Sequence, residues 1–121
     1  IRATIESVAY QTYDLFEAMK HDGLRPKLVK VDGGMVMNNW FSQFLSDIIN
    51  IKVLRPKVQE TTALGAAFMA GLQIGVYKSL KDISKNWQLD KNFTPKINSK
   101  ERNNLVKGWS ASIKKTLTKT I

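Results

Sequence analysis

The first apolar stripe of the chain has the spacing of a helix. Its apolar positions within residues 1–19 are Ile1, Ile5, Val8, Leu15, Phe16 and Met19. Because this spacing keeps them near one helical face, it predicts an amphipathic helix that ends in the polar stretch 20–23. Pro26 prevents easy continuation, since the residue before a proline is pushed toward extended geometry.

Short runs of alternating β-branched residues then predict two strands. The run 27–32 stops at Gly33 and Gly34, and the run 52–54 stops at the pair 55–56, which is Arg-Pro. A strand, a glycine turn, a helix and a second strand form the βαβ pattern. This pattern makes the two strands parallel neighbours in one sheet.

The helix between the strands is predicted from a strong apolar stripe. Asn38 or Asn39 can cap its first turn. Its apolar residues fall at i, i+3, i+4 and i+7, as Phe41, Phe44, Leu45 and Ile48. The opposite, polar face is predicted to hold Ser42, Gln43, Ser46 and Asp47.

After this unit the composition changes to small residues. Residues 60–72 are rich in Gly and Ala, which favours a helix whose backbone another element or a ligand can approach closely. We expect a short helix over residues 79–87 and an extended connection over residues 90–97.

The last stretch, residues 98–121, predicts a terminal helix. Asn98 followed by Glu101 forms a capping pair. The helix then carries one apolar stripe of Leu105, Trp109, Ile113 and Leu117.

Composition limits the possible classes of protein. With 121 residues, of which 43% are hydrophobic and 9% aromatic, the chain can bury a core as one domain. It has no cysteine and a single histidine, His21, which excludes disulfides and thiolate metal sites. No apolar run approaches the length of a membrane span, so we expect a cytoplasmic protein without a membrane partner.

The net charge of +9 belongs to the end of the chain. Residues 1–77 hold 8 basic and 7 acidic side chains, whereas residues 78–121 hold 11 basic and 3 acidic ones. The excess lysines are spaced singly, at Lys78, Lys81, Lys85, Lys107, Lys114, Lys115 and Lys119. This pattern is typical of a solvated lysine face, and a surface that binds nucleic acid or another polyanion is the alternative.

The pair Gly33–Gly34 is the feature with most chemical content. Two glycines between a strand and a helix remove side chains where a flat or anionic ligand must lie against backbone, and the helix start supplies donors. A nucleotide or phosphate therefore fits this turn. Taken alone, the same residues also suit a plain turn.

The residues around the turn resemble those of a known family. They are 31–39, Gln43, Ser46, Asp47, Arg55, Pro56, Glu60, 62–67, Ala70, Gly71 and Gly75. In this order they resemble the C-terminal part of the glycerol kinases, within the FGGY family of carbohydrate kinases. The likeness extends toward both ends, with Arg2, Ala3, Glu6, Ala9, Tyr10, Gln11, Glu101, Arg102, Asn103, Gly108 and Trp109.

The resemblance implies an α/β fold of short parallel strands with flanking helices, part of a C-terminal actin-like (ribonuclease-H-like) ATPase domain. Residues 1–121 would form the C-terminal portion of the second kinase domain, with the helix of 98–121 packed on it. Because residue 1 opens a helix without a capping side chain, we expect further sequence upstream. For the full-length enzyme we expect ATP and glycerol as substrates, sn-glycerol 3-phosphate and ADP as products, Mg²⁺ as the metal, and a homo-oligomer.

The resemblance also implies which residues bind the nucleotide. Gly34 is expected to contact it through its backbone, Asn38 to hydrogen-bond the adenine, and Gly33 to allow the turn. The actin-like pattern usually has a small residue where this chain has Val36, so we expect a slightly reshaped site. The two methionines that flank the turn are expected either to line the adenine pocket or to fill gaps; they are Met35 and Met37.

No catalytic residue and no metal ligand is expected in this chain. In the family, the catalytic carboxylate and the groups that hold glycerol lie upstream of the matching segment, so we expect the chain alone to be inactive. Asp32 is expected to tether the turn, Asp47 has no base or metal partner in view, and His21 is expected in an exposed turn. The tryptophans are expected to pack rather than to stack on bases; they are Trp40, Trp87 and Trp109.

Two alternatives stay open for the function. One is a kinase of the same family that acts on another sugar or polyol, because the residues that contact the acceptor lie outside the matching segment. The other is a basic module for nucleic acid or acidic partners, although we expect no nucleic-acid partner.

Overall fold

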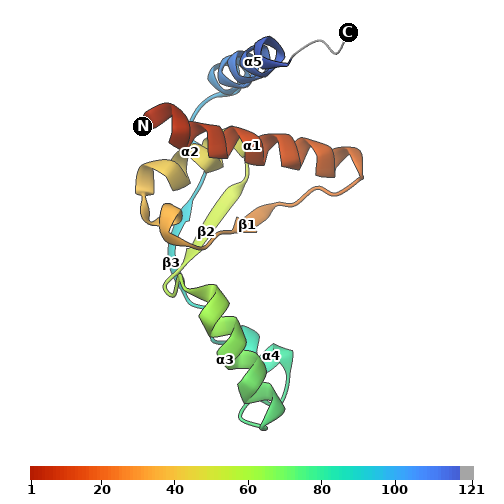
Figure 1. Ribbon diagram of the computed structural model, residues 1–121, viewed down its shortest axis with the longest axis vertical. Coiled ribbons are helices and arrows are strands. Elements are labelled where there is room, and N and C mark those ends of the chain that lie inside the picture. The colour runs from red at the N-terminus through yellow and green to blue at the C-terminus, as the bar shows by residue number, and fades with distance from the viewer. Residues whose placement is uncertain (118–121) are drawn as a thin grey trace.

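A small sheet occupies the middle of an elongated molecule. The computed structural model describes residues 1–117. Helices α1 and α2 lie beside the sheet, α3 and α4 extend beyond one end of it, and α5 lies near the other end, beyond α1 (Figure 1).

The first half of the chain forms the predicted helix–strand–helix–strand unit. Its elements are α1 (Arg2–His21), β1 (Leu28–Lys30), the 3₁₀ turn η1 (Gly34–Met37), α2 (Asn39–Ile49) and β2 (Lys52–Pro56). The predicted helices and strands of this half are confirmed, although β1 is shorter and β2 longer than expected. The 3₁₀ turn was not predicted.

The second half contains α3 (Thr61–Gln73), α4 (Leu80–Ser84), β3 (Leu89–Phe93) and α5 (Ser99–Thr116). The predicted helices are confirmed within the described residues. The predicted extended connection over 90–97 contains most of β3, whose pairing with β2 was not predicted.

The sheet has three strands in the order β1–β2–β3. β1 and β2 are parallel, with Val29 opposite Val53, so the predicted parallel pair is confirmed. β3 is antiparallel to β2, which makes the sheet mixed rather than purely parallel. In β3 only Phe93 is buried, and therefore this edge strand lacks the apolar alternation that reveals a strand in a sequence.

The core lies where α1 and α2 meet the sheet. Its buried apolar residues include Ala9, Phe16, Val36, Phe41, Leu45, Ile49, Ile51, Val53 and Phe93, and Ile48 is fully buried. Asn38 caps α2 as predicted, since its side chain accepts hydrogen bonds from the N–H groups of Trp40 and Phe41.

The polar face of α2 is mostly covered by the protein rather than by solvent. Ser42, Ser46 and Asp47 are buried. The Ser46 hydroxyl lies within hydrogen-bond distance of two carbonyl oxygens, 2.9 Å from Ile51 and 3.1 Å from Phe93. Short hydroxyl side chains can be buried in this way because backbone carbonyls satisfy them.

Residues 57–88, here called the arm, leave the sheet and return to it. The Lys57 N–H donates to the Gln88 carbonyl at 2.9 Å where the two ends meet. The predicted close approach occurs at Gly71, the only buried residue of α3. A Cβ atom there would lie 2.9 Å from the ring of Tyr77, whereas one at Gly65 would meet nothing within 4 Å.

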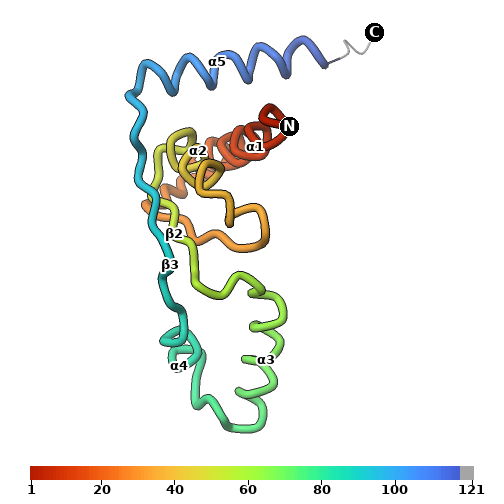
Figure 2. Tube along the Cα trace, turned by 90° about the vertical axis from the view of Figure 1, so that its left-hand side faces the viewer, coloured from red at the N-terminus to blue at the C-terminus, as the bar shows by residue number. Residues whose placement is uncertain are grey.

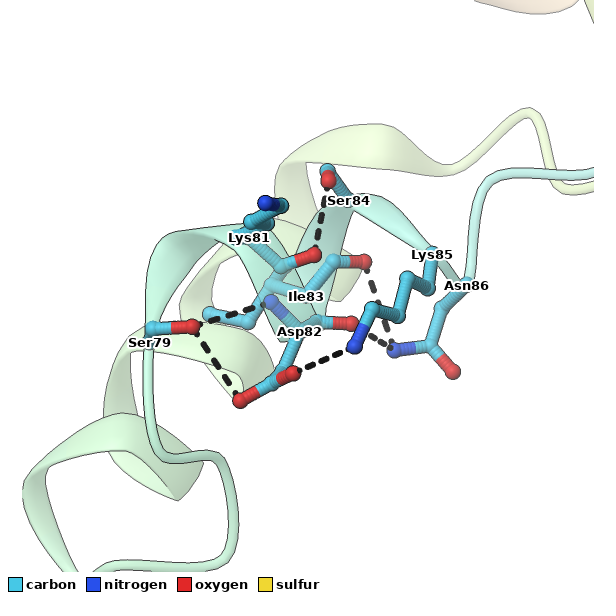
Figure 3. Close-up of polar contacts among 7 residues, drawn as sticks. All are labelled: Ser79, Lys81, Asp82, Ile83, Ser84, Lys85 and Asn86. Atoms are coloured by element: carbon cyan, nitrogen blue, oxygen red, sulfur yellow. Dashed lines mark hydrogen bonds and ion pairs between the residues drawn. The ribbon is translucent and has the colours of Figure 1, made fainter.

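Hydrogen bonds between near neighbours in the sequence surround helix α4, within the arm (Figure 3). Ser79 caps it by accepting from the Asp82 N–H at 3.2 Å, and Lys85 donates to the Asp82 carboxylate at 2.8 Å. The hydrogen bond from Lys85, followed by that from Ser79, lowers the pKa of Asp82.

Trp109 of helix α5 contacts α1. The ring of Trp109 stacks on Tyr10 with centroids 5.3 Å apart, and its Nε1–H donates to the Asp14 carboxylate at 2.7 Å. Burial, and then the charge of Glu6, raises the pKa of Tyr10. The helix predicted over 98–121 includes residues 118–121, which lie outside the described residues.

The three tryptophans pack, but none of them is buried in the core. Trp40 stacks on Phe44 with centroids 5.0 Å apart, yet it is exposed. His21 ends α1 and is exposed as expected. Within residues 1–117, no helix combines the length and the apolar character that crossing a membrane requires.

Candidate functional site

The Gly33–Gly34 corner joins β1 to η1 and leaves its backbone uncovered. Gly33 has φ 86° and ψ 171°, a conformation that is essentially restricted to glycine. Gly34 has no such constraint, and a Cβ atom at either glycine would meet nothing within 4 Å. The first glycine is therefore required by backbone geometry, whereas the second leaves open space.

The turn after the corner is fixed from inside the protein. Val36 is buried and anchors η1 in the core. Its carbonyl accepts hydrogen bonds from the Ser42 hydroxyl at 2.9 Å and from Arg55 Nη1 at 2.8 Å. Arg55 Nη1 also lies 3.2 Å from the Met37 carbonyl. One side of η1 thus faces the protein, while Met35 and Met37 are exposed.

Asn38 stands at the end of this turn and at the start of α2. Its Oδ1 accepts from the N–H groups of Trp40 at 2.9 Å and Phe41 at 3.3 Å. The cap uses the side-chain oxygen. The exposed side chain therefore offers a ligand its Nδ2–H₂ group, which can only donate hydrogen bonds.

The other side of the corner is tied to the arm. The Thr61 hydroxyl donates to the Asp32 carboxylate, and the Gly33 N–H donates to the Gln59 carbonyl at 3.3 Å. Asp32 therefore tethers the turn, as predicted. A hollow of about 130 Å³ opens beside this tether, lined by Lys30, Val31, Asp32, Pro56, Thr61 and Trp87.

Asp32 and Asp47, the two carboxylates considered from the sequence, both have structural partners. Asp47 accepts from the backbone N–H of Lys96 at 2.6 Å and from Gln43 Nε2 at 3.0 Å. Among residues 1–117, no group of three or more His, Cys, Asp or Glu side chains is placed to hold a metal ion.

Gly33, Gly34 and Asn38 lie on one continuous turn. Sequence reasoning missed the buried support of that turn, Ser42 and Arg55. For Arg55 a signal was present, because Val53 and Arg55 are two residues apart in a strand and therefore point to the same face. An arginine on the buried face of a strand needs polar partners inside the protein.

Comparison with known proteins agrees with this architecture. Residues 1–74 match the model of the FGGY family of carbohydrate kinases, C-terminal domain. A glycerol kinase of Gluconobacter oxydans (strain 621H) is 49% identical over 118 residues, which is 97% of this chain and 23% of that protein.

Solved structures give the same result. The crystal structure of Plasmodium falciparum glycerol kinase with ADP matches with a TM-score of 0.82 and 35% identity, over 98% of this chain and 24% of that one. A ligand-bound xylulose kinase from Lactobacillus acidophilus matches with a TM-score of 0.78, and a gluconate kinase from the same organism with 0.74, each at 25% identity over 98% of this chain and 24% of theirs.

These neighbours confirm the expected α/β fold, part of an actin-like (ribonuclease-H-like) ATPase domain. The chain spans about a quarter of the length of the relatives it matches. With its family model matched over residues 1–74 and its fold shared with three solved sugar and polyol kinases, the chain belongs to the FGGY family of carbohydrate kinases.

Proposed function

We propose that this chain supplies the adenine-nucleotide corner of a kinase that transfers the γ-phosphoryl group of ATP to glycerol, yielding sn-glycerol 3-phosphate and ADP. The observation that carries the proposal is the uncovered backbone at Gly34, next to the donor group of Asn38. The 49% identity to a glycerol kinase supports glycerol as the acceptor, and the matching structure that holds ADP supports the nucleotide.

The corner fits an adenosine for simple physical reasons. A glycine without a Cβ atom lets a flat ring lie against the main chain. The Nδ2–H₂ group of Asn38 would donate to an acceptor nitrogen of the adenine, since its oxygen is used by the helix cap. Gly33, with φ 86° and ψ 171°, begins the turn that carries Gly34 and leads to Asn38.

Mg²⁺ would come with the phosphates of the nucleotide. Phosphoryl transfer depends mainly on positioning and on neutralisation of charge by such a metal and its ligands. Asp32 and Asp47 are engaged in structural hydrogen bonds, and we expect the proton acceptor and the glycerol-binding groups elsewhere in a longer protein. We expect the 121-residue chain alone to be inactive.

Another acceptor is the second candidate. The xylulose and gluconate kinases share this fold at 25% identity, so the architecture of the corner does not select the acceptor. A kinase for another sugar or polyol would use the same nucleotide contacts.

The product of the whole reading frame that encodes this chain provides the test. We expect ATP-dependent phosphorylation of glycerol with a higher kcat/KM than for xylulose or gluconate, and no turnover by the 121-residue chain. A higher kcat/KM for a sugar would favour the second candidate. ATP consumption that ignores every polyol and sugar would contradict both.

Three further expectations stay predictions: a cytoplasmic location, a homo-oligomer at full length, and the absence of a nucleic-acid partner. Binding to nucleic acid would fall steeply with added salt if the lysine-rich end of the chain were responsible. We expect no such binding.

A further inference from the structure

Arg55 is a buried cation whose hydrogen bonds go to η1, the turn that follows Gly33, and to β3. Only 7% of the residue is exposed. Its Nη1 donates to the carbonyls of Val36 and Met37, and its Nε–H donates to the Asp90 carboxylate at 2.7 Å. Its guanidinium also lies over the ring of Phe93, 5.5 Å from the centroid.

Burial of this charge is not explained by stability alone. An apolar side chain of similar volume is often at least as stable as a buried ion pair, because desolvation offsets the attraction. What an arginine adds is a rigid, planar set of donors with fixed directions. Here those donors fix two carbonyl oxygens of a 3₁₀ turn relative to β2 and β3.

Besides Arg55, the side-chain supports of the turn are the Ser42 hydroxyl and the buried Val36. The turn is the four-residue element Gly34–Met37, and of its side chains only Val36 is buried. Met37 directly precedes Asn38, so the Met37 carbonyl that Arg55 contacts belongs to the peptide group shared with Asn38. A shift of the guanidinium would therefore release the Val36 and Met37 carbonyls, and with them the peptide group that joins η1 to Asn38.

We propose that the Arg55–Asp90 pair is the positioning unit of the nucleotide corner. Arg55 acts through the main chain of Val36 and Met37, and Asp90 orients the guanidinium from β3. This inference rests on the proposed function, because it assigns the corner to an adenine nucleotide. The pair sets affinity for the nucleotide and leaves the acceptor site unaffected.

Two variants weaken the unit to different degrees. Arg55→Lys keeps the charge, but a single ammonium group cannot reproduce the forked donors that reach Asp90 and both carbonyls. Asp90→Asn is milder, since 39% of the Asp90 side chain is exposed. Asp47→Asn is the matched control, because Asp47 is as buried as Arg55 but holds Gln43 and Lys96 instead of the turn.

The measurements use the product of the whole reading frame. They are the Kd for ADP by calorimetry, the KM for ATP and for glycerol, and hydrogen exchange of residues 33–38 without nucleotide. Because a small misplacement of a binding group can lower a rate or affinity by up to about 100-fold, we expect Arg55→Lys to raise the ADP Kd and the ATP KM at least about tenfold. Exchange over residues 33–38 should become faster, with the KM for glycerol unchanged.

The other variants separate positioning from general destabilisation. Asp90→Asn should raise the ADP Kd in the same direction by a smaller factor, and it carries the test if Arg55→Lys does not fold. Asp47→Asn should lower the Tm and leave the ADP Kd unchanged. An unchanged ADP Kd in the positioning variants, or an equal rise in Asp47→Asn, overturns the inference. If the unmodified protein binds no ADP, the proposed function is wrong, and the positioning role falls with it.

Discussion

The two ends of β2 lead into regions built in opposite ways. On one side, α1, α2 and the sheet form a region here called the layer, which encloses the apolar core. Even the buried hydroxyls and charges of the layer have partners. On the other side, the arm (residues 57–88) runs out from the sheet as α3 and α4 (Figure 2). Its exposed large apolar side chains are Val58, Met69, Ile74, Val76 and Leu80.

This difference distinguishes the layer, which stabilises the fold, from the arm, which projects from it. The layer gains its stability from burial, which is roughly proportional to the apolar area removed from water. The arm relies on local hydrogen bonds, such as those around Asp82, and on one aromatic contact, Phe68 against Tyr77 at 5.5 Å. The Gly33–Gly34 corner and η1 lie at the junction, supported by the layer through Arg55 and joined to the arm through Asp32.

The largest effect is expected from deleting core volume in the layer. Ile48 is fully buried in α2, so Ile48→Ala should lower the free energy of unfolding by about 2–5 kcal/mol, through lost burial and the cavity left behind. Thermal or denaturant unfolding of the 121-residue chain measures this change.

Ile74→Ala is the matched change in the arm. Ile74 is 77% exposed, and surface substitutions of this kind alter stability by no more than about 0.5 kcal/mol. Equal losses in the two variants would contradict the contrast between layer and arm.

A smaller effect is expected at the corner itself. Gly33→Ala forces a Cβ atom into a backbone conformation that only glycine adopts readily, and should destabilise the protein by about 1–3 kcal/mol. The arm contains a comparable glycine, Gly75, with φ 80°. Gly75→Ala should loosen the arm locally and change global unfolding less, as hydrogen exchange of the two regions would reveal. A Gly33→Ala variant as stable as the parent would show that the corner relaxes freely.

The smallest effect concerns pH in the arm. The pKa of Asp82 is lowered in the folded chain by Lys85 and then Ser79, so its ionised form stabilises α4 at neutral pH. This contribution is present above the unfolded pKa and is lost as the pH falls through the folded pKa. The hydrogen-exchange protection factors over residues 79–86 should fall on acidification below about pH 4 in the parent, and should depend less on pH in Asp82→Asn. An identical pH profile in both would remove Asp82 as the cause.

Local patterns in the sequence were enough to predict the βαβ unit. The cap at Asn38 and the stripe that includes Phe41 and Leu45 act within a few residues, and the parallel pairing of β1 and β2 follows from the connection between them. The Gly33–Gly34 turn was found for the same reason. Its assignment to adenosine came from the resemblance to a family.

Features that depend on distant partners could not be predicted. β3 pairs with a strand more than 30 residues earlier and exposes most of its side chains, so it carries no strand pattern. Ser46 reads as polar, but it is buried because carbonyls of Ile51 and Phe93 meet it in the folded chain. Arg55 closes a strand in the sequence, and its link to the corner exists only once β2, β3 and η1 are assembled.

The proposed nucleotide site requires that a nucleotide occupy the open space beside Gly34. Since a Cβ atom at Gly34 would meet nothing within 4 Å and its φ is unstrained, Gly34→Leu should leave the Tm of the whole reading-frame product unchanged. Calorimetric titration with ADP is the direct measurement. We predict that the ADP Kd rises at least about tenfold, a loss of about 1.4 kcal/mol in binding free energy, with the KM for glycerol unaltered. ADP binding as tight as in the parent would contradict the account.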